Sequence, residues 1–264
     1  MLSRFGVVPY ANSLDTVGLL ARAVAPIRDL VLAGPDHPGR LGRAARALQD
    51  RCGARVVPVS LPSTRHALAA YYVIAPAEAS SNLAKYDGVR YGTRDAAARA
   101  SDAAAGGVLY AASRGSGFGD EVKRRILLGS YTLSSEAMDN YFIQAQRVRR
   151  LVRRDFDRVF ALDNPLHEPE TFDLAALDEL ADVMRQTPLD AYMNDVFTVP
   201  ASLAGLPAIS IPMPLASAPG TAIAAGGGPR VAGLQLIGQY WDDARLLAVA
   251  EAVAEVLRTA PLSR

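Results

Sequence analysis

The sequence predicts an α/β fold, in which short strands alternate with helices. Runs rich in β-branched and apolar residues occur at 55–61 (RVVPVSL), 208–212 (AISIP) and 231–238 (VAGLQLIG). Longer stretches between them have the apolar spacing of helices, which points to a sheet flanked by helices. Half of the 264 residues are hydrophobic and 21% are charged, a balance typical of a globular protein with a sizeable core.

The first third of the chain begins this alternation. Residues 5–10 (FGVVPY) are expected to form a short strand and residues 12–15 a turn. Ser63 is the expected N-cap of the helix that contains Tyr71, since it precedes that helical stretch. The remaining expected helices are residues 16–33, started by Thr16 and ended by the Pro/Gly-rich loop 34–39, and residues 40–52.

The strongest periodic signal lies in residues 135–160, where apolar side chains recur at three- and four-residue spacing. This spacing predicts a helix with one buried face. Aspartates among the arginines of its other face favour a solvated surface over a phosphate-binding one. The apolar face comprises Met138, Tyr141, Phe142, Ala145, Val148, Leu151, Val152, Phe156 and Val159; the polar face comprises Arg147, Arg150, Arg153, Arg154 and Arg158, with Asp139, Asp155 and Asp157.

The other elements follow from helix spacing and from turn residues. Residues 120–133 are expected to be a helix, preceded by a flexible loop at 115–119 (GSGFG). Asp242 or Asp243 is expected to cap a final helix that runs to about Leu257. The remaining predictions are a loop at 163–173, a helix at 174–186 and a surface loop at 216–229.

Composition excludes several function classes. The net charge of +1 offers no overall attraction to nucleic acid or to an anionic membrane. With one cysteine, Cys52, no intramolecular disulfide can form, and the three histidines match no zinc spacing. No apolar run approaches the ~20 residues that span a bilayer. The N-terminal segment has the pattern of neither a signal peptide nor a good transit peptide.

Five segments resemble a known family in the right order along the chain. They are residues 3–18 (SRFGVVPYANSLDTVG), 71–92 (YYVIAPAEASSNLAKYDGVRYG), 117–134 (GFGDEVKRRILLGSYTLS), 192–212 (YMNDVFTVPASLAGLPAISIP) and 233–238 (GLQLIG). The chain is similar to the amidase-signature family. Within that family it most resembles the glutaminase subunits of glutamyl-tRNA(Gln) amidotransferases, of the mitochondrial fungal type.

The resemblance implies a mixed β-sheet flanked by helices, here the C-terminal portion of one amidase-type domain, residues 1–264. It implies a mitochondrial matrix protein that hydrolyses glutamine and passes ammonia to a partner, so that Glu-tRNA(Gln) becomes Gln-tRNA(Gln). Its partners would be the other amidotransferase subunits, above all the one that binds tRNA, with tRNA met indirectly. The chain itself would bind no cofactor and no metal, whereas the complex would use ATP and Mg²⁺.

The chain departs from the family pattern in three places. The family's catalytic lysine and its two serines would precede the position that matches Ser3, and these 264 residues do not contain them. The stretch near 34–45 is shorter than in the family. Between Phe160 and Asp190 the family's apolar strand, which ends in a Pro-Thr-Ala-Pro-like turn, is not found. We therefore expect two sheet strands to be missing, in a truncated or mis-spliced product or a degenerate paralogue, and the chain alone to be inactive.

No residue of the chain is a good candidate for the catalytic machinery. A lysine acts as a base only where burial lowers its pKa, and Lys85 and Lys123 lie in polar segments. Ser116 lies in a Gly-rich stretch, but no lysine or histidine is placed to serve it. It is expected to be an ordinary loop serine.

Residues suited to binding an amino acid are better represented. An arginine fork suits a carboxylate, and an aspartate suits an ammonium group. By resemblance, Arg125 would bind the α-carboxylate of glutamine, Asp195 its ammonium, and Tyr71 would contact the amino-acid end. From spacing alone Arg125 is equally a surface charge, Asp195 a helix cap and Tyr71 a core aromatic. Three further polar residues of the matched segment are expected to satisfy loop backbone groups rather than to shape the pocket: Glu78, Asn82 and Asp87.

Three other interpretations of the chain remain open at this point. The chain could be a non-catalytic binding or scaffold protein derived from an amidase. It could be a fragment of a general amidase, in which case Arg125 and Asp195 would not line one pocket. It could also be a gene-model artefact, whose missing strands would expose sheet edges and core residues.

Overall fold

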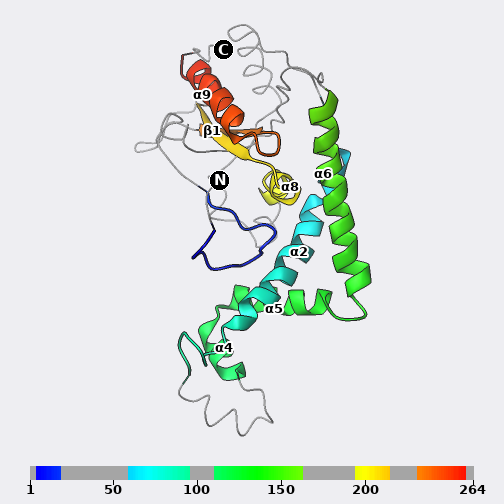
Figure 1. Ribbon diagram of the computed structural model, residues 1–264, viewed down its shortest axis with the longest axis vertical. Helices are drawn as coiled ribbons and strands as arrows, with labels where there is room; N and C mark the ends of the chain where they lie inside the picture. Colours follow the sequence, from blue (N-terminus) through cyan, green and yellow to red (C-terminus); the bar gives the residue numbers. More distant parts are fainter. Residues whose placement is uncertain (1–3, 19–58, 96–109, 163–193, 215–230, 260–264) are drawn as a thin grey trace, which may run out of the picture. The chain divides into compact units, whose positions relative to one another are not determined.

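The structure, a computed structural model, describes residues 4–18, 59–95, 110–162, 194–214 and 231–259 (Figure 1). The chain divides into two compact units by its internal contacts. Unit 1 consists of Met1–Val17 and Ala69–Arg149, and unit 2 of Gly18–Leu68 and Arg150–Arg264. The expected single domain, 1–264, stays a prediction.

Helix α2 (Ala67–Asn82) supplies much of the core of unit 1. Its buried residues in unit 1 are mostly alanines: Ala70, Ile74, Ala75, Pro76, Ala77 and Ala79. A 3-10 turn, Pro62–His66, precedes the helix and a second one, Leu83–Lys85, follows it. The prediction of a helix that contains Tyr71 is confirmed.

Helix α5 (Asp120–Thr132) crosses α2 at very short distance (Figure 1). A Cβ at Gly129 would lie 1.9 Å from the carbonyl oxygen of Pro76, which is far inside van der Waals contact. Only glycine allows this approach of the two backbones. The α5 prediction is confirmed. The loop prediction for 115–119 is wrong in part, because α4 (Ala111–Gly117) includes its first three residues.

The N-terminal segment, residues 4–18, is a loop rather than a strand. The expected strand at 5–10 is wrong. Gly6 has a φ of 87°, which belongs to a turn rather than to a strand, and Phe5 is 99% exposed. The turn at 12–15 is confirmed, since the backbone N–H of Asp15 donates to the carbonyl oxygen of Ala11 at 2.7 Å.

The predicted helix at 135–160 is interrupted near its start. A π-helical turn, η3 (Met138–Ile143), precedes the regular helix α6 (Gln144–Leu162). The buried face of α6 holds the predicted Ala145, Val152, Phe156 and Val159. The expected burial of three further residues is wrong, because Met138, Tyr141 and Leu151 are exposed. The π turn has more residues per turn than an α-helix, so the three- and four-residue spacing does not keep Met138 and Tyr141 on the buried face. Nothing in the structure explains the exposure of Leu151, which lies in the regular helix.

Unit 2 contains the two predicted strands, β1 (Ala208–Pro214) and β2 (Val231–Ile237), and the structure pairs them antiparallel. The register pairs Ile209 with Leu236 and Ile211 with Leu234, and all four side chains are buried. Helix α9 (Asp243–Thr259) contacts both strands and contributes Leu246, Ala250 and Val253 to the core. The helix begins beside Asp242, as expected. Short helical segments η5 (Asn194–Val196) and α8 (Val199–Ala204) precede β1.

Asp155 differs from its expected place on a solvated face. It is 2% exposed, and its Oδ2 accepts a hydrogen bond from the backbone N–H of Ser63 at 2.7 Å. Arg158 also bonds this carboxylate. The prediction that Ser63 is the N-cap is wrong, because the helical segment already starts at Pro62. The carboxylate that satisfies this helix start comes from Asp155.

Several sequence predictions fall outside the described residues. They are the helices at 16–33 (beyond residue 18), 40–52 and 174–186, most of the strand at 55–61, and the loops at 34–39, 163–173 and 216–229. Among the described helices, none has the length and apolar character needed to cross a membrane. Within the same residues, no cluster of three potential metal ligands occurs.

Candidate functional site

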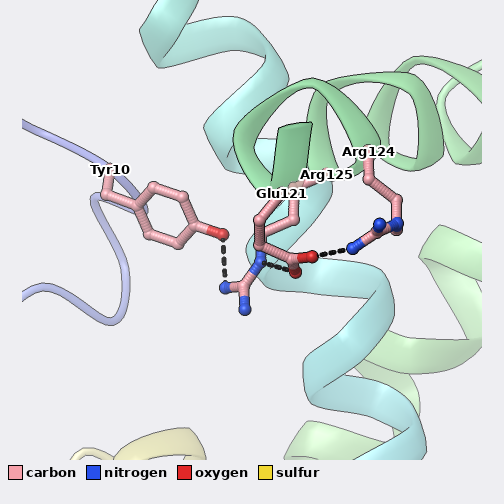
Figure 2. A network of polar contacts seen from close by, with 4 residues as sticks. All are labelled: Tyr10, Glu121, Arg124 and Arg125. Carbon is pink, nitrogen blue, oxygen red and sulfur yellow. Dashed lines mark hydrogen bonds and ion pairs between the residues drawn. The ribbon is translucent and has the colours of Figure 1, made fainter. Parts of the chain in front are cut away.

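Arg125 lies on α5 in unit 1, where its guanidinium is held between two partners (Figure 2). Its Nε donates to Oε1 of Glu121, one helical turn earlier, at 2.9 Å. Its Nη1 donates to the hydroxyl oxygen of Tyr10, in the N-terminal loop, at 3.0 Å. The side chain remains 30% exposed. Arg125 is therefore a fixed, partly accessible cation rather than a mobile surface charge.

The electrostatics of this group leave one positive charge unbalanced. Figure 2 shows Glu121 bonded to both neighbouring arginines, through Oε1 to Arg125 and through Oε2 to Arg124. Burial lowers the pKa of Arg125, but the bonds with Tyr10 and Glu121 raise it to a net value above the usual range. The bond from Arg125 is the largest cause that lowers the pKa of Glu121. Two cations and one anion make a site suited to one carboxylate.

The loop that carries Tyr10 is tied to α2 by side chains of that helix. The backbone N–H and the hydroxyl of Ser13 donate to Glu78, the first at 2.9 Å. Asn82 donates to the carbonyl oxygen of Tyr10 at 3.0 Å. Asp87 accepts from the backbone N–H of Val89 at 2.8 Å, and this bond lowers its pKa. The interpretation that Glu78, Asn82 and Asp87 satisfy loop backbone groups is confirmed.

A second arginine, missed by the sequence reasoning, fixes the same loop. Arg149 donates from Nη1 to the hydroxyl of Ser13 at 2.7 Å and from Nη2 to its carbonyl oxygen at 2.9 Å. Burial lowers the pKa of Arg149, and the nearby charge of Glu78 opposes that change. Its partner is 136 residues away in sequence, so no local pattern could have indicated the contact.

The other two predicted binding residues, Tyr71 and Asp195, are both half-buried. Tyr71 lies on α2 in unit 1, half-buried, with its ring edge-on to that of Tyr72 at 5.2 Å between centroids. Asp195 lies in η5 in unit 2, also half-buried, and Thr198 donates to its backbone carbonyl at 3.3 Å. The assignment of Tyr71, Arg125 and Asp195 to glutamine stays a prediction.

A family model described as Amidase matches residues 31–247. This chain belongs to the amidase family. The match covers most of the chain and agrees with the sequence resemblance, so the predicted family is confirmed.

Fungal proteins are among the relatives of this chain. The mitochondrial glutamyl-tRNA(Gln) amidotransferase A subunit of Podospora anserina is 53% identical over 343 residues, which cover 98% of this chain and 65% of the relative. The Neurospora crassa protein of the same name is 50% identical over 362 residues, with the same two coverages. The chain thus spans about two thirds of the length of these relatives.

Both alignments are longer than the 264-residue chain. The relatives therefore carry residues inside the matched span that this chain lacks. The expected shortenings near 34–45 and between Phe160 and Asp190 stay predictions.

Solved structures give the same fold. The crystal structure of the glutamyl-tRNA(Gln) amidotransferase A subunit from Thermotoga maritima has a TM-score of 0.58 and 27% identity, over 100% of this chain and 57% of that one. A crystal structure described only as an amidase has a TM-score of 0.57 at 19% identity, over 96% of this chain and 57% of its own, which shows the fold alone. The predicted α/β amidase fold is confirmed.

Lys85, Lys123 and Ser116, the candidates that the sequence offers for catalytic groups, do not have the surroundings of a catalytic base or nucleophile. Lys85 is exposed, with its ammonium 5.3 Å from the ring centroid of Tyr86, and Lys123 pairs with Asp120 at 3.3 Å. Neither has the buried surroundings that a lysine base needs. Ser116 is an exposed residue of α4 that donates back to the carbonyl oxygen of Ala112 at 3.0 Å. It is a helix serine, where an ordinary loop serine was expected.

Proposed function

We propose that this chain is the glutamine-recognition part of the glutaminase subunit of a mitochondrial glutamyl-tRNA(Gln) amidotransferase. The observation that carries the proposal is the pair of bonds that fixes Arg125 as a partly accessible cation with unbalanced charge. An arginine fork of this kind binds a carboxylate with two parallel hydrogen bonds. The names of the fungal relatives support an amidotransferase subunit and a mitochondrial location. Free glutamine as the ligand and the matrix as the compartment are part of the proposal.

In this proposal the chain grips both charged ends of glutamine. Arg125 binds the α-carboxylate, Asp195 the α-ammonium, and Tyr71 packs against the amino-acid end. The side-chain amide of the bound glutamine would react with a serine nucleophile, a role that this proposal assigns to none of the described residues. The ammonia released passes to the tRNA-binding subunit, which amidates Glu-tRNA(Gln). ATP and Mg²⁺ act in the complex as a whole, and the enzyme class is that of a glutamine-hydrolysing ligase.

The proposal predicts binding without turnover. The purified 264-residue chain should bind L-glutamine in isothermal titration calorimetry and release no ammonia from it. Arg125→Gln should weaken binding about 10–100-fold, because a charge-assisted pair is lost. Lys123→Gln, which removes a neighbouring exposed cation of the same helix, should leave affinity unchanged. Ammonia release that a serine-directed inhibitor abolishes would overturn the inactive state of the chain.

A second function, that of a non-catalytic binding protein, is favoured by exposed apolar side chains on α5. Leu127 is 72% exposed and Tyr131 59% exposed, on a helix whose glycine packs on α2. Apolar surface of this kind is typical of protein interaction sites. Co-purification with the tRNA-binding subunit together with undetectable glutamine binding would favour this function over the first.

A further inference from the structure

We propose that Glu121 and Tyr10 are positioning residues, which together set the direction in which Arg125 presents its guanidinium to the ligand. The inference rests on the proposed function, since the ligand is the α-carboxylate of an amino acid. It adds two residues from different parts of unit 1, one from α5 and one from the N-terminal loop.

The geometry of the guanidinium shows what each contact does. Glu121 occupies the Nε side at 2.9 Å and Tyr10 occupies Nη1 at 3.0 Å, so the planar group is held at two of its three nitrogens. Among the described residues, Nη2 has no hydrogen-bond partner, and Figure 2 shows it pointing away from both contacts. The Nη end of the fork is therefore the part that can meet a carboxylate.

Tyr10 can do more than hold the arginine. Its hydroxyl oxygen accepts from Nη1, and its own O–H proton remains available as a donor. A carboxylate at the Nη end of Arg125 would lie beside this hydroxyl. Tyr10 is itself fixed, because Asn82 holds its carbonyl oxygen and Asp15 accepts from its backbone N–H at 2.9 Å.

Arg124 explains why Glu121 does not cancel the charge of Arg125. Glu121 bonds Arg124 with its second carboxylate oxygen, so its single negative charge is shared between two cations. An arginine held in advance loses less conformational freedom when the ligand binds. Glu121 thus orients Arg125 while enough positive charge remains for the carboxylate.

The test compares two ligands and three variants on the full chain. The ligands are L-glutamine and L-glutaminamide, whose α-carboxylate is replaced by an amide. Glu121→Gln and Tyr10→Phe should each weaken L-glutamine about tenfold in calorimetry, the loss of one oriented charged contact. Both should leave the weaker glutaminamide affinity unchanged. Asp120→Asn is the matched control, because it removes the exposed pair with Lys123 on the same turn of α5.

A ligand-free measurement separates this inference from the proposed function. In ¹⁵Nε NMR the Arg125 Nε–H should exchange slowly in the wild type and in Asp120→Asn, and rapidly in Glu121→Gln. Fast exchange already in the wild type, or unchanged glutamine affinity in Glu121→Gln and Tyr10→Phe, would overturn the positioning role. Slow exchange in a wild type that binds no glutamine would overturn the proposed ligand alone. Equal weakening of both ligands by Glu121→Gln would show a purely structural role and also overturn the inference.

Discussion

Single carboxylates have very different roles in this chain, and burial decides which. Asp155 and Asp157 lie two positions apart on α6, and the sequence pattern predicted a solvated position for both. Asp155 is 2% exposed and satisfies the backbone N–H of Ser63, whereas Asp157 is exposed and pairs with Arg153. Removing a buried hydrogen-bond acceptor leaves its donor without a partner. When one member of an exposed ion pair is removed, water hydrates the other member.

This contrast gives a prediction at the residue scale. Asp155→Ala should lower the free energy of unfolding by about 2–3 kcal/mol, because the Ser63 N–H and the helix start at Pro62 lose their acceptor. Asp157→Ala should cost less than about 1 kcal/mol. Urea unfolding followed by far-UV circular dichroism measures both. Equal effects of the two substitutions would contradict a capping role for Asp155.

Sequence patterns indicated the candidate site only as far as local spacing reaches. The Glu121–Arg125 pair follows the i,i+4 rule for helices, so it was visible in principle once the α5 helix was expected. The contact of Arg125 with Tyr10 joins residues 115 positions apart, and no pattern within either segment indicates it. The binding role of Arg125 came from family resemblance, and only the fold supplied its partners.

At the scale of elements, helices and strands with continuous periodicity were predicted well. Helix α5, helix α9 and the β1–β2 pair all lie within a few residues of their expected bounds. The predictions were wrong where a local irregularity interrupts the regular spacing of buried side chains. The π turn at Met138–Ile143 displaced part of the predicted apolar face, and the turn at Gly6 prevents a strand. Such irregularities depend on tertiary packing, which spacing does not encode.

The α2–α5 crossing provides the prediction at this scale. Gly129→Ala should destabilise the protein by about 2–3 kcal/mol, because the new methyl group would overlap the Pro76 carbonyl and force the backbones apart. Gly115→Ala in α4 is the control, since nothing lies within 4 Å of its Cβ position. There the gain in helix propensity should stabilise by up to about 1 kcal/mol. Thermal unfolding measures the two changes, and a neutral Gly129→Ala would contradict the close crossing.

For the whole molecule, the open question is whether the two compact units fold as one domain. Two continuous helices contain the points where the chain passes between units. Helix α2 does so between Leu68 and Ala69, and α6 between Arg149 and Arg150. Helix formation is cooperative along the chain, so fraying on one side of such a point destabilises the other. The single domain stays a prediction, which hydrogen exchange can test.

Gly129→Ala allows a direct test, because it perturbs unit 1 while β1 and α9 report on unit 2. Their buried amides, such as those of Ile209, Ile211 and Val253, should exchange hydrogen only through global opening. In a single cooperative domain, hydrogen exchange measured by mass spectrometry should accelerate in β1 and α9 by the factor that corresponds to the global loss of stability. Gly115→Ala should slow it or leave it unchanged. Exchange in β1 that stays at the wild-type rate, while the unit 1 helices exchange faster, would mean that the units open independently, and the single-domain prediction would be wrong.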